Sequence, residues 1–218
     1  MPLLGGAAVL IWNDITPEGR DAFYAWHNTE HMPERAAIPG FLRGRRYIAD
    51  DAGTAPEFFT LYEVATPAVL TGADYLARLN APTEWTRRAT QAFRNTSRAL
   101  AQVIRSDGLG AGGLIGTVRL PARLALDEAR IASAIEGPQI TGFHLCATNE
   151  AASAERTNES RGRTDIGAAP VFTILVEGCG SAALSGAMAR LQAAALAPAN
   201  HAATIGIYRL EYECRRES

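Results

Sequence analysis

Short apolar runs of strand length alternate along the chain with longer amphipathic segments. The apolar runs predict strands near residues 4–13, 41–49, 57–65, 98–105, 112–120, 141–148, 170–177 and 202–212. Helices are expected near residues 17–31, 67–79, 83–95, 126–135 and 181–195. Each half of the chain therefore follows the order strand, helix, strand, strand, helix, strand, which is the pattern of a ferredoxin-like βαββαβ unit.

Four short segments recur in the same order in the two halves, which indicates a tandem duplication. The pairs are Ile38–Phe41 with Ile140–Phe143, Phe59–Val64 with Phe172–Glu177, Leu70–Ala73 with Leu184–Ala187, and Ala99–Arg105 with Ala203–Arg209. We place the first repeat at residues 1–107 and the second, more degenerate repeat at residues 110–218, with a glycine-rich linker over 106–113.

A four-stranded sheet with helices on one face leaves its other face in need of cover. Two such antiparallel sheets can cover each other when they pack face to face. The sequence thus predicts an α+β protein whose two repeats form a sheet sandwich or closed barrel, with an interior that can hold a small ligand.

Composition narrows the classes of function. The 218 residues carry 21 basic and 23 acidic side chains, so no basic field favours a nucleic-acid or membrane partner. Every basic residue is Arg, which excludes Schiff-base chemistry, a Lys general base and a P-loop.

The cysteines and the first apolar run bear on location. Cys146, Cys179 and Cys214 form an odd set without CxxC spacing, which fits a reducing, cytoplasmic environment. The apolar run over residues 3–12 is too short to span a bilayer, and we interpret it as a strand.

One helix carries the most informative chemistry. Thr16 as N-cap and Pro17 at the first helical position mark its start, and Pro33 is expected to end it. One stripe of this helix contains Phe23, Trp26, His27, Glu30 and His31. We expect the stripe to face inward, with His27, His31 and Glu30 as catalytic acid/base residues and Phe23 and Trp26 as substrate-binding residues. The alternative is a pair of hydrogen-bonded structural histidines.

The segment His27–His31 also matches the H-x-x-E-H pattern of some zinc hydrolases. A catalytic zinc site needs a third protein ligand, and the sequence offers no evident one near this helix. We therefore expect no metal here.

The segment Trp26–Arg35, followed by Ile38–Phe41 and Arg45–Tyr47, resembles the EthD-like branch of the dimeric α+β barrel superfamily. The resemblance covers residues 5–105 in detail and the second repeat only in outline. It implies a dimeric α+β barrel of two ferredoxin-like repeats and places the motif histidines at His27 and His31. Members of the superfamily include cofactor-free monooxygenases, isomerases, polyketide cyclases, decarboxylases and haem-binding enzymes, so the resemblance implies the fold more firmly than the reaction.

Other candidate residues lie on strands and in one long loop. Arg43, Arg45 and Tyr47 alternate on one strand face with Arg46 on the other; Arg45 and Tyr47 are candidate substrate-binding residues, or else part of an exposed charged face. His144 and His201 are possible haem ligands. The polar stretch over 149–167 is expected to be a solvated loop or a substrate lid.

These observations lead to one hypothesis with two alternatives. We expect a small-molecule enzyme of isomerase, lyase or cofactor-free oxygenase type, in which His27 or His31 moves a proton on an aromatic, enol or lactone substrate, without a bound cofactor. The second repeat lacks His and aromatic residues in its first helix, so the site should belong to the first repeat. The alternatives are a carrier or sensor of a hydrophobic metabolite and a haem-binding protein. A homodimer is possible.

Overall fold

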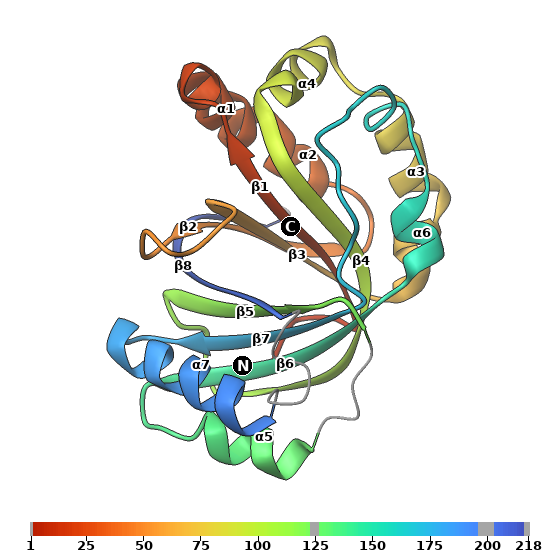
Figure 1. The fold of residues 1–218 in the computed structure, drawn as a ribbon. Helices are drawn as coiled ribbons and strands as arrows, with labels where there is room; N and C mark the ends of the chain where they lie inside the picture. The colour runs from red at the N-terminus through yellow and green to blue at the C-terminus, as the bar shows by residue number, and fades with distance from the viewer. Residues whose placement is uncertain (1, 123–126, 196–202, 216–218) are drawn as a thin grey trace.

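Eight antiparallel strands close into one barrel in the computed structural model, which describes residues 2–122, 127–195 and 203–215 (Figure 1). The strands are β1 Ala7–Ile15, β2 Phe41–Ala49, β3 Phe58–Val64, β4 Phe93–Gly108, β5 Leu114–Leu120, β6 Ile140–Thr148, β7 Phe172–Gly178 and β8 Thr204–Cys214. Around the barrel they follow the order β1-β3-β2-β8-β5-β7-β6-β4. No helix among the described residues is long and apolar enough to cross a membrane.

The two halves contribute four neighbouring strands each. The order β4-β1-β3-β2 in the first half is repeated as β8-β5-β7-β6 in the second, and the pairings β2–β8 and β4–β6 join the halves. Figure 1 shows the helices of the first half on one side of the barrel and α5 and α7 on the opposite side. The barrel therefore has one shared interior and two outer faces, each covered by its own helices.

The helices fall where the sequence predicts helical segments, with different boundaries, except α6, which lies in the stretch expected to be a loop. They are η1 Pro17–Gly19, α1 Arg20–Trp26, η2 His27–His31, α2 Met32–Ala36, η3 Pro67–Thr71, α3 Ala73–Asn80, α4 Glu84–Ala89, η4 Thr90–Ala92, α5 Glu128–Ala134, α6 Glu150–Ala154 and α7 Ser181–Ala195.

Pro33 does not end the first helix, contrary to the prediction. Residues His27–His31 form a π-helical turn, in which the amide of Met32 donates to the carbonyl of His27 five residues earlier. The wider turn relieves the clash of the proline ring with the preceding turn, so the helix continues to Ala36.

The prediction of a helix over 83–95 is also too long. Only Glu84–Ala92 is helical, and β4 begins at Phe93, where it pairs with Ile15 of β1. Burial of the Phe93 ring against Phe23 and Trp26 stabilises the extended start of the strand. The 16 residues of β4 pair with β1 along their first part and with β6 along their last.

Side chains fill the barrel interior, which corrects the expectation of a ligand-holding hollow there. Trp12 stacks on Phe59 with ring centroids 5.0 Å apart, and Tyr47 and Tyr208 pack against the same phenyl ring. The buried interior cluster comprises Leu3, Ala8, Leu10, Trp12, Tyr47, Phe59, Leu61, Ala99, Ala101, Ile115, Cys146, Leu175 and Tyr208.

A buried chain of charged groups crosses the interior between the halves. Arg45 of β2 pairs with Glu63 of β3 and with Glu177 of β7, each at 2.9 Å. Nε2 of His144 lies 3.2 Å from Glu177, and Nδ1 of His144 lies 2.8 Å from the hydroxyl of Ser106. Although burial alone would raise it, the hydrogen bonds from His144 and Arg45 lower the pKa of Glu177 to about 2.

Removing the central carboxylate should therefore destabilise the protein strongly. We expect Glu177→Ala to lower the free energy of unfolding by about 3–5 kcal/mol, because Arg45 remains buried without its partner from the second half. Urea unfolding measures this effect. The exposed Glu136→Ala change is the control, with an expected effect below about 0.5 kcal/mol. Equal stability of the two variants would contradict the structural role of the chain.

Candidate active site

A pocket of about 530 Å³ lies on the outer face of the first half of the barrel, not inside it. Three sides come from the first half: the helix with His27 and His31, the outward residues of β1 and β3 such as Asn13 and Thr60, and β4 with Arg98. The fourth side comes from the chain between β6 and β7 of the second half. We call this segment, residues 149–171, the strap; Figure 1 shows it running beside β4 and α3.

Hydrogen bonds fasten the strap to the first half at two places. At β4, the amide of Thr96 donates to the carbonyl of Asp165 at 2.9 Å, and its hydroxyl donates to the carboxylate of Asp165 at 2.6 Å. At the helices, the amide of Glu159 donates to the carbonyl of Leu79 on α3, and the Glu159 carboxylate pairs with buried Arg35 on α2. The expected solvated loop is thus a hydrogen-bonded wall of the pocket.

His27 and His31 are both buried and both line the pocket, with 4% and 6% of their surface exposed. Their rings stack with centroids 5.4 Å apart and an angle of 18° between the planes. Trp26 lies 4.3 Å from the His31 ring and also lines the pocket. Phe23 stacks behind His27 at 4.9 Å and supports that ring without being part of the pocket lining.

An arginine determines which nitrogen of His27 carries the proton. Nη1 of Arg46 lies 3.2 Å from Nδ1 of His27 and also donates to the side chain of Asn28 at 2.6 Å. Because a guanidinium only donates, Nδ1 of His27 must accept, and the ring proton is on Nε2. Nδ1 of His31 is buried and has no hydrogen-bond partner among the described residues.

Both imidazoles are neutral at physiological pH. Burial, and then the positive charges of Arg46 and Arg35, hold the pKa of His27 well below its usual range. Burial, Arg35 and the neighbouring His27 lower the pKa of His31 in the same way. The pocket therefore holds two different imidazoles. Arg46 fixes His27 as an Nε2–H donor, whereas it does not fix the tautomer of His31.

The structure separates three other candidate residues from the pocket. The carboxylate of Glu30 accepts a 2.6 Å hydrogen bond from the hydroxyl of Thr83, and the hydroxyl of Thr86 lies 3.3 Å away, so Glu30 links the histidine helix to α4. Arg45 and Tyr47 lie inside the barrel, which corrects both interpretations of them, as substrate-binding residues and as an exposed face. Successive side chains of β2 point to opposite faces of the sheet, so Arg45 and Tyr47 lie on the inner face and Arg46 lies on the outer face.

The structure describes only one of the two proposed haem ligands, and that one is not among the pocket residues. His144 lies inside the barrel with both ring nitrogens within hydrogen-bond distance of Ser106 and Glu177. His201 lies outside the described residues.

Sequence reasoning missed several residues that line the pocket. They are Ile11, Asn13, Thr60, Phe93, Thr96, Arg98 and Arg163. Strand alternation places Ile11 and Asn13 on the face opposite the interior residues Leu10 and Trp12, but it does not show that the pocket is on that face. No pattern in the sequence indicates that the strap crosses to the other half.

Comparison with known proteins identifies the fold. No family model matches the chain, and no curated protein matches it. Among solved structures, an anthrone oxidase-like protein superposes with a TM-score of 0.60 at 10% identity, over 98% of this chain and 95% of the other. A mutant chlorite dismutase from Candidatus Nitrospira defluvii superposes with a TM-score of 0.54 at 7% identity, over 96% and 92% of the two chains. The chain thus shares its overall fold with these two proteins.

Neutral buried histidines predict a particular dependence of stability on pH. Below the ordinary His pKa of about 6.5, the unfolded chain binds protons at His27 and His31 that the folded protein does not bind. Stability should therefore fall as the pH falls below about 6.5, by about 1.4 kcal/mol per pH unit for each ring.

Unfolding curves of the unmodified protein and the His27→Gln, His31→Gln double variant between about pH 5 and about pH 8 measure this dependence. The two should differ in slope below about pH 6.5 and not above it. Parallel curves over the whole range would show that the rings are not held neutral.

Proposed function

We propose that the protein is a small-molecule enzyme of the EthD-like branch, acting by acid/base catalysis on a planar aromatic, enol or lactone substrate. The observation that carries the proposal is the stacked pair of neutral, buried imidazoles lining a 530 Å³ pocket, a volume in the usual range for small-molecule sites. The same two residues, His27 and His31, are the histidines of the sequence motif that resembles the EthD-like branch.

We also propose that the chain is a tandem pair of ferredoxin-like repeats, at residues 1–107 and 110–218. The equal strand order of the two halves supports this interpretation. In this arrangement the first repeat carries the reacting groups, and the second contributes the other half of the barrel and the strap.

The two histidines have different roles in the proposal. His31 removes a proton from an acidic C–H or O–H group of the substrate and becomes an imidazolium. The electron pair left on the substrate spreads onto an enolate or phenolate oxygen, and the Nε2–H of His27 stabilises that oxygen by a hydrogen bond. Return of the proton from His31 to another substrate atom completes an isomerisation.

The surroundings of the rings favour a flat substrate that develops negative charge. Trp26 and Phe93 offer aromatic surfaces in the pocket, and Ile11 and Leu79 add apolar contacts. Arg98 is the cationic side chain on the β4 side, where its guanidinium lies 3.5 Å from the hydroxyl of Tyr75. Its charge would stabilise an enolate or phenolate.

Haem does not fit the nitrogen chemistry of this pocket. A metal-ligating histidine normally donates its second ring N–H to a carboxylate or a carbonyl. His27 instead accepts a hydrogen bond from Arg46 at Nδ1, so its Nε2 carries a proton, and Nδ1 of His31 has no partner of either kind among the described residues.

Substitution of each histidine tests the proposal. With a panel of phenolic, enolic and lactone substrates, we expect His31→Gln to lower kcat by about 10²- to 10⁴-fold, as for the loss of a general base. His27→Ala should lower kcat by about tenfold or more, because one donor to the developing oxyanion is lost. Glu30→Gln is the control and should retain turnover.

The pH profile gives a second readout of the same chemistry. Because both imidazoles stay neutral, kcat should remain flat from about pH 8 to about pH 6. Undiminished turnover in both histidine variants would refute the proposal. Tight binding of panel compounds that are recovered unchanged would point to a carrier or sensor, and a visible absorbance band after haem addition would point to haem binding.

A further inference from the structure

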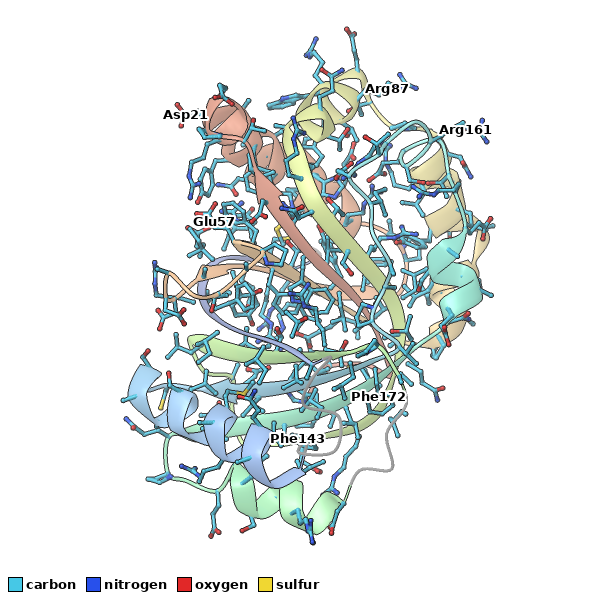
Figure 2. The ribbon with its side chains drawn as sticks, viewed as in Figure 1. Asp21, Glu57, Arg87, Phe143, Arg161 and Phe172 are labelled. Carbon is cyan, nitrogen blue, oxygen red and sulfur yellow. The ribbon has the colours of Figure 1, made fainter. Side chains whose placement is uncertain are left out.

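A second groove, of about 740 Å³, opens beside the pocket between α4, the start of β4 and the strap. Its charged lining residues are Arg87, Arg94, Arg161, Arg163, Glu159 and Asp165. Figure 2 shows Arg87 on α4 and Arg161 on the strap at the same end of the molecule. Four guanidinium groups thus face two carboxylates, although the whole chain has a net charge of -2.

Both carboxylates of this groove are already neutralised. Glu159 pairs with buried Arg35, which is not part of the groove. Asp165 accepts two hydrogen bonds from the guanidinium of Arg163, at 3.0 and 2.6 Å.

Three arginines remain available in the groove. Within the described part of the chain, Arg87, Arg94 and Arg161 form no ion pair; Arg94 donates only to the carbonyls of Gln91 and Phe93. All three side chains belong to exposed residues. Several like charges around one concave surface raise the local concentration of anions.

The groove and the pocket share a wall. Thr90, Phe93, Glu159 and Arg163 line both, and the guanidinium of Arg163 lies over the Phe93 ring at 5.0 Å. The two cavities therefore adjoin at Phe93, and the free arginines lie on the far side of this shared wall from the histidines.

We propose that the groove binds an anionic substituent of the substrate, a carboxylate or a phosphate ester, while its planar part lies at His27 and His31. This inference rests on the proposed function and adds the substrate class to it. Arginine suits the role because its fork of N–H donors matches the paired oxygens of both anions. The proposed proton transfer does not need the positive charges of the groove. The groove would therefore determine which substrates bind and how tightly they bind.

Three matched ligands test the proposal by calorimetry: neutral naphthol, a hydroxynaphthoate with its carboxylate on the ring opposite the hydroxyl, and the corresponding hydroxynaphthyl phosphate. Both anions should bind at least about tenfold more tightly than naphthol, and a rise from about 50 mM to about 500 mM salt should reduce that preference. The carboxylate and phosphate arms show which anion the groove prefers.

The variants separate the groove from the pocket. In the triple variant Arg87→Gln, Arg94→Gln, Arg161→Gln, the preference for anions should disappear while naphthol binds as before. Arg88→Gln is the matched control, because Arg88 lies on the same helix, pairs with Glu84 and does not line the groove.

The outcomes distinguish failure of the inference from failure of the proposed function. Equal binding of naphthol and the anions, or an anion preference that survives in the triple variant, would overturn the inference and leave the histidine chemistry standing. If no ring compound binds, the proposed function fails, and inorganic pyrophosphate alone then tests the groove. Pyrophosphate binding that is lost in the triple variant would support the groove as an anion site, and binding that is absent or unchanged would overturn it.

Discussion

Closure of the eight strands into one barrel is the constraint on which the rest of the structure depends. The β2–β8 and β4–β6 pairings bring the inner faces of the two sheets together, and aromatic rings and the Arg45–Glu177 pair fill the space between them. A ligand therefore has to bind on an outer face. The first half provides room there because its helical layer and the strap together form a pocket over β1, β3 and β4.

The halves depend on each other in two ways. Glu177 of the second half neutralises Arg45 of the first inside the barrel, and Asp165 of the second half holds the strap to Thr96 of the first. Because both halves belong to one chain, both contacts form without a second subunit. This arrangement also explains how the second half can lack histidines in its first helix and still form part of the site.

Much of this arrangement could be predicted from the sequence. The periodicity of apolar residues shows which side chains share one face of a strand or helix, and the recurring segments show the order of the elements. The alternation along β2 correctly placed Arg46 opposite Tyr47, and the stripe on the histidine helix correctly brought Trp26, His27 and His31 together. It could not show which sheet face the pocket uses, since both faces of β1 are buried. The path of the strap depends on tertiary contacts without a local signal. The π-helical turn answers a local constraint, the ring of Pro33, but that proline alone predicts the end of a helix as readily as a wider turn.

The central claim is that Arg46 and burial hold His27 as a neutral Nε2–H donor beside a neutral His31. Nitrogen NMR of the imidazole rings at about pH 7, followed down to about pH 5.5, tests it most directly, since the ordinary His pKa of about 6.5 lies in that range. The account predicts a protonated Nε2 and a bare Nδ1 in His27, with neither ring titrating over the range. A proton on Nδ1 of His27, or titration of either ring near pH 6.5, would contradict it.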